Sequence, residues 1–407
     1  MRDFKQSLSL FWLLMSAASV CAQTSPLRMD LKAALDLAES SNLELRAARQ
    51  QRAVALAGLK IASQIPNPTV SVAAARDLPH ESLLWDQPIE LAGQRGKRRA
   101  VAQEEQKATE LDIGVLARQI RRRTREAFYR AILSGEQTGQ AKAALDLATR
   151  VAEVVRQRFE AGDVAQLEVI QAEVEVARAT AEYEATVQTQ KIADVQLAAL
   201  LNLPLEGTLT LSGRLEDLPK AEALPVITGK ALSSNGEVQR AAQEFELEQR
   251  KLALAKAQRI PNVSLQAGVD LNAPPDFNVG PRGQIAVSLP LFYHGQGEVA
   301  QSSARLEFLR TVLQARRTTA SAEVMAAYYD FVAKAGQSEQ FGRRIVPASA
   351  KLAEMAEDSY RSGKSNLLTL IDAQRRLNET RKSYLDSLFA VQSSFAALEE
   401  VVGGSLD

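Results

Sequence analysis

The chain carries one structural unit twice, and this duplication limits its possible folds more than any other feature of the sequence. The segment Ile65-Pro66-Asn67 recurs 195 residues later as Ile260-Pro261-Asn262. Three more markers recur in the same order at shifts of 200 to 202 residues: Pro88 and Gly93-Gln94 as Pro290 and Gly295-Gln296, Phe128-Tyr129 as Tyr328-Tyr329, and Phe159 and Gly162 as Tyr360 and Gly363. Chance could produce one such match but hardly four in one order, so two equivalent copies are predicted.

Each copy is predicted to run helix, strand, strand, helix, helix, which makes the fold class mainly α with a small β part. In the first copy, a helix over about 31–63 should end before Ile65-Pro66, because proline lacks an amide donor and restricts the residue before it. The predicted order is a first repeat over 23–203 with strands at about 69–77 and 82–91, a connector over 204–225, and a second repeat over 226–407 with strands at about 263–271 and 283–291.

The fourth element of each copy is predicted to be a very long helix. In the first copy it covers about 96–160, which at a rise of about 1.5 Å per residue gives about 100 Å, more than the depth of a compact core. Ser134-Gly135 and Ala335-Gly336 could each break these helices, and we expect a bend there rather than an end. Gly162 and Gly363 predict tight turns after them, because glycine readily takes the left-handed conformation that ends helices.

The last helix of each copy carries an apolar stripe at seven-residue spacing. In the second copy the stripe consists of Leu370, Leu377, Tyr384, Val391 and Leu398, and the matching first-copy positions are Val169, Val176, Tyr183, Gln190 and Leu197. A sustained seven-residue repeat predicts packing as a left-handed coiled coil.

The predicted strands alternate apolar with polar residues, as Val263, Leu265 and Ala267 do with Ser264 and Gln266. Tilted strands of about nine to eleven residues would cross a bilayer with one face toward lipid and the other toward water. A soluble hairpin packed on a helix fits the pattern equally well. Four strands cannot close a barrel, and open edges are not tolerated in lipid, so membrane-embedded strands would have to be completed by other protomers.

Residues 1–22 are typical of a secretory signal peptide. Arg2 and Lys5 precede the apolar run 8–20, which is too short to cross a bilayer as a helix. Cleavage is predicted after Ala22 and would leave the mature chain without cysteine. The alternative is a lipoprotein acylated at Cys21, although Val20 is a poor match to the small residue preferred before such a cysteine.

Composition and motifs argue against several classes of function. The chain has 49 basic and 49 acidic residues, so no nucleic-acid partner is indicated, and the run Arg121-Arg122-Arg123 with Arg125 is interpreted as a solvated helix face. His80 and His294 lie in different copies, which argues against a histidine metal site. No nucleophile elbow, phosphate-binding loop or pair of catalytic carboxylates occurs, so we predict a non-enzyme without cofactor.

With these features the chain resembles the TolC family of outer-membrane efflux proteins. The resemblance covers about residues 30–402 and rests on the paired Ile-Pro-Asn segments, the paired glycine turns and the segment from Tyr360 to Gln374, which is similar to the family's last-hairpin signature. The run from Gln87 to Arg98 resembles the strand-exit motif of the cobalt-zinc-cadmium efflux branch.

The resemblance implies a homotrimer in the cell outer membrane, in which three times four strands form a barrel in the outer-membrane lipid and the long helices form a periplasmic tunnel. It implies a passive channel of a tripartite efflux system, which works with a periplasmic adaptor and a proton-driven (RND-type) inner-membrane pump on metal cations or small toxic compounds. Gly162 and Gly363 would form the inner tips of the tunnel.

The resemblance also implies an entrance gate near these tips. Asp372 matches one position of the family's acidic ring, and Thr369 stands at the other, so the ring would carry half the charge. Tyr360 and Glu168 match positions of the links that close the entrance.

Two other functions stay open at this point. A type I protein-secretion outlet would share the architecture, and the kind of pump that works with the chain would separate it from small-solute efflux. A soluble periplasmic coiled-coil scaffold or adaptor is the other alternative, although an adaptor should carry one helical hairpin flanked by β-rich modules. Recovery from the outer membrane or from the periplasm would distinguish these classes.

Overall fold

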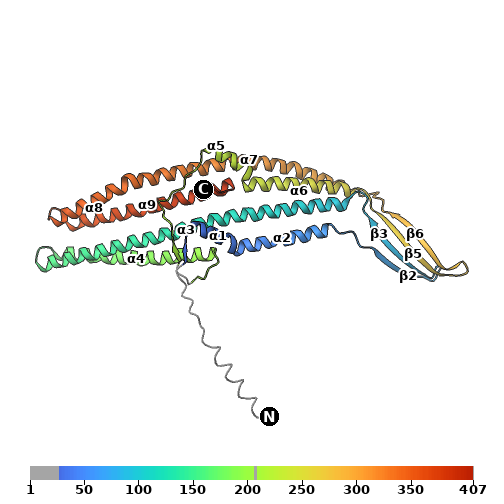
Figure 1. Ribbon diagram of the computed structural model, residues 1–407, viewed down its shortest axis with the longest axis horizontal. Coiled ribbons are helices and arrows are strands. Elements are labelled where there is room, and N and C mark those ends of the chain that lie inside the picture. The colour runs from blue at the N-terminus through green and yellow to red at the C-terminus, as the bar shows by residue number, and fades with distance from the viewer. Residues whose placement is uncertain (1–26, 206–208, 407) are drawn as a thin grey trace, which may run out of the picture.

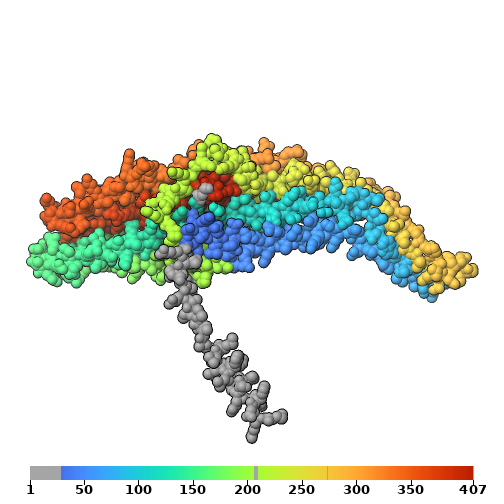
Figure 2. Space-filling view, viewed as in Figure 1, coloured from blue at the N-terminus to red at the C-terminus, as the bar shows by residue number. Residues whose placement is uncertain are grey.

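The computed structural model describes residues 27–205 and 209–406, which form a long, slender and slightly curved body (Figure 1, Figure 2). The four-stranded sheet lies at one end, and the turns that connect the long helices lie at the other (Figure 1). The C-terminus lies near the middle of the body. The predicted signal peptide, with Cys21, lies outside the described residues.

Both copies contain the predicted order of helix, strand, strand, helix and helix, with a short strand before it, a break in the first helix and, in the second copy only, a π-helical turn. The first copy consists of β1 (Leu27–Met29), α1 (Leu31–Ser41), α2 (Leu43–Ala62), β2 (Thr69–Ala74), β3 (Glu81–Ile89), α3 (Gln94–Glu160) and α4 (Gln166–Leu200). The second consists of β4 (Leu209–Leu211), α5 (Leu224–Ser234), α6 (Gly236–Gln258), β5 (Val263–Ala273), β6 (Phe277–Val287), α7 (Gln296–Gln340), the π-helical turn η1 (Phe341–Ile345), α8 (Val346–Arg361) and α9 (Leu367–Val402). The predicted fold class, mainly α with a small β part, is confirmed.

The antiparallel sheet has the order β2-β3-β5-β6, so β3 and β5 join the two hairpins. The range 283–291 predicted for the last strand is wrong, because β6 covers Phe277–Val287. The chain reverses soon after Asn272, whose φ of 55° is left-handed, and Ala273 already pairs with Phe277. Residues 288–291 have no partner on β5, because β5 begins opposite Val287.

An asparagine interrupts the first helical segment of each copy, so the single helix predicted over 31–63 is also wrong. Asn42 and Asn235 each cap the helix that follows, because the side-chain oxygen accepts an amide hydrogen bond. Their side-chain nitrogens donate to the last helix of the same copy, from Asn42 to the Leu200 carbonyl (3.0 Å) and from Asn235 to the Val401 carbonyl (2.7 Å). These two contacts tie the C-terminal ends of α4 and α9 to the helices that lead into the sheet.

The long helices continue through both positions where a bend was expected. α3 passes through Ser134-Gly135 as α-helix, and α7 passes through Ala335-Gly336 in the same way. The irregularity of the second copy is η1, which comes directly before Val346-Pro347. Pro347 has no N–H to give to the carbonyl of Arg343, and a wider π turn accommodates this lost hydrogen bond.

Three apolar clusters lie along the body in place of a single core. The first packs α3 against α1 and α4 around Phe128 and Leu197, and the second packs α5, α7 and α9 around Phe395. The third lies at the helical tips. In the seven-residue stripe of α9, Leu370, Leu377, Val391 and Leu398 are buried, which confirms the predicted packing seam.

The arginine run of α3 is not simply a solvated face, and that interpretation is wrong for Arg125. Its guanidinium forms an ion pair with Glu399 of α9 (2.8 Å), and both side chains are buried. Arg125 also lies over the ring of Phe395, 4.7 Å from the centroid. Arg122 pairs with Glu400 (2.6 Å) in a more exposed position. The run therefore fastens α3 to the C-terminal helix.

A short parallel contact joins the two copies near the middle of the body. β1 pairs with β4, which lies within the predicted connector 204–225, and Met29 faces Leu211. None of the described helices is both long enough and apolar enough to cross a membrane.

Candidate entrance gate and two-faced sheet

One face of the sheet is apolar and exposed. Alternation along the strands and the register between them place these apolar side chains on it: Val70, Val72, Leu83, Trp85, Ile89, Val263, Leu265, Val269, Leu271, Val279, Ile285 and Val287. Val72 is 79% exposed and Ile285 is 68% exposed. Glu81 and Gln87, near the ends of β3, are the polar exceptions. Such a continuous apolar surface is not stable in water and indicates contact with lipid or protein.

The opposite face of the sheet carries most of its polar side chains, including Ser71, Ser82, Asp86, Ser264, Gln266, Asp270, Arg282 and Gln284. The Gln266 amide donates to Asp86 (2.7 Å), and Arg282 lies 3.9 Å from Asp270. A sheet with one lipid-compatible face and one hydrated face has the alternation expected of membrane strands that line a water-filled space.

Both edges of this sheet, β2 and β6, have no strand beside them within the described residues. Backbone N–H and C=O groups at such edges need partners before the strands can enter lipid. The sheet of one chain is therefore incomplete as a membrane structure.

At the opposite end of the body, two glycine turns close the helical hairpins. Gly162 has a φ of 83° and Gly363 a φ of 71°, so both take the left-handed conformation. The residue after each glycine returns a hydrogen bond to the last helical turn, from Asp163 to the Arg158 carbonyl and from Lys364 to the Ser359 carbonyl (both 2.8 Å). The same glycine-dependent helix end thus occurs in both copies.

Just behind these turns, the hairpins α3/α4 and α8/α9 pack together through a small apolar cluster. Its buried members are Val155, Ala172, Tyr360, Leu367, Leu370 and Ile371. Because it joins one hairpin of each copy, this cluster holds the two tips side by side.

Tyr360 and Glu168, the predicted closing link, lie together at this cluster. The Tyr360 hydroxyl donates to the Glu168 carboxylate (3.4 Å), and Arg158 lies over the Tyr360 ring, 5.4 Å from its centroid. Burial raises the pKa of Tyr360, and the negative charge of Glu168 raises it further, whereas Arg158 opposes the shift. The hydroxyl therefore remains protonated and able to donate throughout the physiological pH range.

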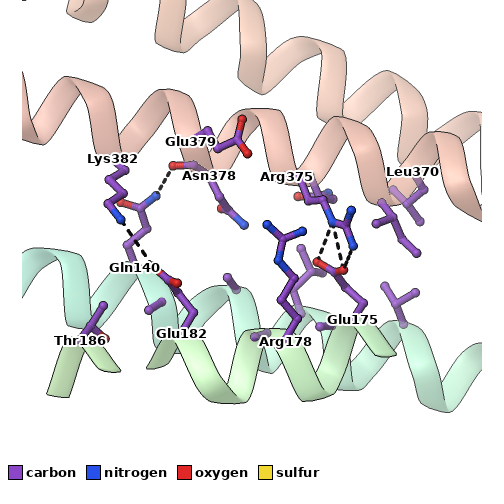
Figure 3. Close-up of a pocket in the computed structure, with 18 of the residues that line it drawn as sticks. Gln140, Glu175, Arg178, Glu182, Thr186, Leu370, Arg375, Asn378, Glu379 and Lys382 are labelled. Carbon is purple, nitrogen blue, oxygen red and sulfur yellow. Dashed lines mark hydrogen bonds and ion pairs between the residues drawn. The ribbon is translucent and has the colours of Figure 1, made fainter. Parts of the chain in front are cut away.

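Two more links between α4 and α9 follow, which the sequence analysis missed. Arg375 makes a forked ion pair with Glu175, with Nε 3.0 Å from one carboxylate oxygen, and Lys382 lies 3.5 Å from Glu182 (Figure 3). Glu175 raises the pKa of Arg375. Glu168, Glu175 and Glu182 are seven residues apart, as are Arg375 and Lys382, so complementary charges at heptad spacing were the available signal.

A cavity of about 320 Å³ lies between the two hairpins beside these links (Figure 3). Alanines of α3 line one side of it, including Ala141, Ala144 and Ala148, while Arg375, Asn378 and Lys382 line the other. Small side chains leave the helices incompletely packed here. Polar contacts across the cavity, such as Gln140 donating to the Asn378 carbonyl (2.8 Å), therefore add to the apolar attachment between the hairpins.

Asp372, the predicted ring residue, is exposed on α9. Thr369 is exposed too, and its amide and hydroxyl both donate to the side-chain oxygen of Asn366 (3.0 and 2.8 Å). Thr369 is thus the third residue of α9 and supports the N-cap residue Asn366 with a hydroxyl donor, which an ionised acid at this position would lack.

Within the described ranges, no three His, Cys, Asp or Glu side chains are grouped to hold a metal ion. His80 lies beside the Ala75 carbonyl at the end of β2, and His294 lies in the segment between β6 and α7.

Comparison with known proteins connects both ends of the body to one family. Residues 227–404 match the model of the outer membrane efflux protein family. The cobalt-zinc-cadmium resistance protein CzcC of Cupriavidus metallidurans is 24% identical, over 92% of this chain and 90% of that protein. The toluene efflux pump outer membrane protein TtgC of Pseudomonas putida is 25% identical, over 72% of this chain and 64% of that protein.

Solved structures of outer-membrane channels share the fold. VceC of Vibrio cholerae has a TM-score of 0.75 at 17% identity, and the match covers 93% of this chain and 97% of VceC. The open state of MtrE of Neisseria gonorrhoeae has a TM-score of 0.76 at 16% identity, over 93% of this chain and 89% of its own. The second copy of the unit thus matches the outer membrane efflux protein family, and the chain as a whole is similar in sequence to CzcC and in fold to solved outer-membrane channels.

Proposed function

We propose that three copies of this chain form the outer-membrane channel of a tripartite efflux system and conduct solutes passively to the exterior. The two-faced sheet carries this proposal. Its exposed apolar face suits lipid, its polar face suits a water-filled lumen, and its open edges β2 and β6 require strands from neighbouring copies. Three copies would supply twelve strands, enough to close a barrel.

The proposed partners are a periplasmic adaptor, which would meet the tips at Gly162 and Gly363, and a proton-driven inner-membrane pump of the RND type. Similarity to CzcC along most of the chain supports metal cations as the cargo. Similarity to TtgC supports small toxic compounds as the alternative cargo. The channel itself needs no resident metal or cofactor, because the pump would supply the driving force.

The proposal is tested by fractionation and by tolerance assays. We expect trimers that are extracted from the outer membrane only by detergent. Cells that lack the chain should become sensitive to cobalt, zinc and cadmium. Recovery as a soluble periplasmic monomer would contradict the channel. Loss of a secreted protein with unchanged metal tolerance would instead identify a protein-secretion outlet.

A first prediction concerns the proposed acidic ring at the entrance. Three exposed Asp372 carboxylates brought together at a constriction would concentrate cations. Asp372→Asn should therefore lower cation selectivity and change the conductance of the purified channel in planar bilayers. Unchanged conductance and cation response would remove Asp372 from the gate. Asp386 lies farther from the tips, and its exposed carboxylate accepts a hydrogen bond from Gln137. Asp386→Asn therefore provides the control.

A second prediction concerns the link between Glu175 and Arg375. Glu175→Arg would place two cations side by side at partly exposed positions, which should disfavour the closed arrangement by on the order of 1 kcal/mol, or about fivefold in the ratio of open to closed channels. The charge-reversed double variant Glu175→Arg/Arg375→Glu should restore the wild-type ratio. Single-channel recordings measure it, and equal behaviour of single and double variants would show that the ion pair does not hold the entrance.

A further inference from the structure

Gln94 fastens the start of α3 in the first copy to the end of α6 in the second. It follows the left-handed Gly93, and its side-chain oxygen accepts a hydrogen bond from the Ala92 amide (3.1 Å). Its side-chain nitrogen lies within hydrogen-bond distance of the carbonyls of Ala257 (3.3 Å) and Ile260 (3.4 Å) and of the Asn262 side-chain oxygen (3.1 Å). Gln94 is only 4% exposed, so this contact is a built, buried clamp.

Gln296 has the same local geometry in the second copy but lacks the rest of the clamp. It follows the left-handed Gly295, and its side-chain oxygen accepts from the amide of His294 (3.0 Å), two residues before it, as in the first copy. Its side chain is exposed, however, and its amide nitrogen has no hydrogen-bond partner among the residues that the structure describes.

The first copy contains the residues that correspond to the acceptors of Gln94, and no side chain in residues 27–205 or 209–406 clamps them. The shift of 195 residues that relates Ile260-Pro261-Asn262 to Ile65-Pro66-Asn67 also relates Ala257 to Ala62. Asn67 and Ile65 are exposed, and Ala62 is only half-buried, whereas Ala257 is 7% exposed. Each chain therefore has one complete clamp and the two unmatched halves of a second.

The two halves lie beside the two open edges of the sheet. Asn67 comes just before β2, and Gln296 comes after β6, so they flank the strands that lack neighbours. Inside the chain, β3 of the first copy pairs with β5 of the second, directly beside the complete clamp. A second chain that continues the sheet by pairing its β2 with β6 would bring the two halves together.

We propose that Gln296 of one protomer clamps Ala62, Ile65 and Asn67 of the next, repeating between chains the contact that Gln94 makes within one. The partner is thus a second copy of this chain, and the site is incomplete without it. This inference rests on the proposed trimer and adds the residues that set its register at the junction between sheet and helices.

Two other polar contacts between the copies do not repeat in this way. α3 and α6 are also joined by Glu104 with Gln243 (2.9 Å) and by Asp112 with Arg240 (2.6 Å). At the shift of 202 that relates Gln94 to Gln296, Glu104 corresponds to Leu306 and Asp112 to Gln314, so neither acid recurs. The clamp, unlike these two contacts, has its residues repeated by the duplication and available for use between chains.

Paired cysteines test the proposal in the full-length protein in native membranes. Asn67→Cys/Gln296→Cys, treated with a short bismaleimide, should give covalent dimers and trimers on a denaturing gel. The matched pair Gln94→Cys/Asn262→Cys should cross-link only within the chain, as shown by peptide mass analysis. The four single variants control for reaction with Cys21, the one natural cysteine.

Charge variants at the same two positions give a second measurement. Asn67→Asp/Gln296→Lys should preserve a gel-stable trimer, whereas Asn67→Asp/Gln296→Glu should weaken it severalfold in its resistance to detergent dissociation. Detergent-extracted trimers without cross-links at 67 and 296, and with equal stability of both charge variants, would overturn the clamp while leaving the channel proposal intact. Absence of any trimer from the wild-type protein would overturn both.

Discussion

Glu399→Ala should lower the free energy of unfolding by about 3–5 kcal/mol, because it breaks the buried ion pair between Glu399 and Arg125. Glu399 is 6% exposed and also accepts hydrogen bonds from the Ser405 hydroxyl (3.2 Å) and the Leu406 amide (3.0 Å). The substitution should therefore also loosen the residues that follow α9. Denaturant unfolding of the detergent-solubilised protein measures the loss.

The adjacent residue supplies a matched control. Glu400→Ala removes the ion pair with Arg122. The side chains of Arg122 and Glu400 are 39% and 24% exposed, so the expected loss in the free energy of unfolding is at most about 1 kcal/mol. Two neighbouring glutamates with arginine partners on the same helix α3 thus differ in burial and in the two further hydrogen bonds that Glu399 accepts. Equal losses for the two variants would mean that burial does not determine the strength of this contact.

Val72→Arg should greatly reduce the amount of trimer inserted in the outer membrane. Val72 is 79% exposed on the apolar face, and a lipid-facing arginine costs about 2–4 kcal/mol near the middle of a bilayer. About 2 kcal/mol corresponds to roughly a thirtyfold loss in the equilibrium for insertion. Quantitative blotting of outer-membrane fractions at constant expression measures this loss.

Ser71→Arg is the control for this variant, because Ser71 precedes Val72 on β2 and points to the opposite, polar face. A cation there would stand in water, so near-normal insertion is expected. If both variants insert equally well, or if Ser71→Arg is the more harmful, the assignment of the two faces of the sheet is reversed or wrong.

The duplication was the part of the fold that sequence alone could predict, because markers such as Ile-Pro-Asn and the turn glycines encode local backbone geometry. The end of β6 could not be predicted from its alternation, because residues 288–291 continue the pattern but have no partner on β5. The contact between β1 and β4 joins two three-residue segments that are about 180 residues apart, and no local pattern marks it. The break at Asn42 did have a signal, the Ser-Asn pair that recurs at Ser234-Asn235.

The candidate gate was predictable only in part. Tyr360 and Glu168 were identified by family resemblance, and the structure brings them within hydrogen-bond distance; their role in closing the channel remains a prediction. Glu175 and Arg375 were missed, because each is an ordinary surface charge until the other helix is placed beside it. Arg125 was misread for the same reason, since its partner Glu399 lies more than 270 residues later.

The exposed apolar face of the sheet also affects the chain before it reaches its membrane. Side chains such as Val72 and Ile285 cannot be covered by the chain's own helices, which lie along the body beyond the sheet (Figure 1). A protomer that is crossing an aqueous compartment on its way to the membrane therefore exposes an apolar surface that is prone to aggregate. Its yield in the cell should depend on the supply of escorting chaperones, and overproduction should fill the periplasm with aggregates before it fills the outer membrane with channels.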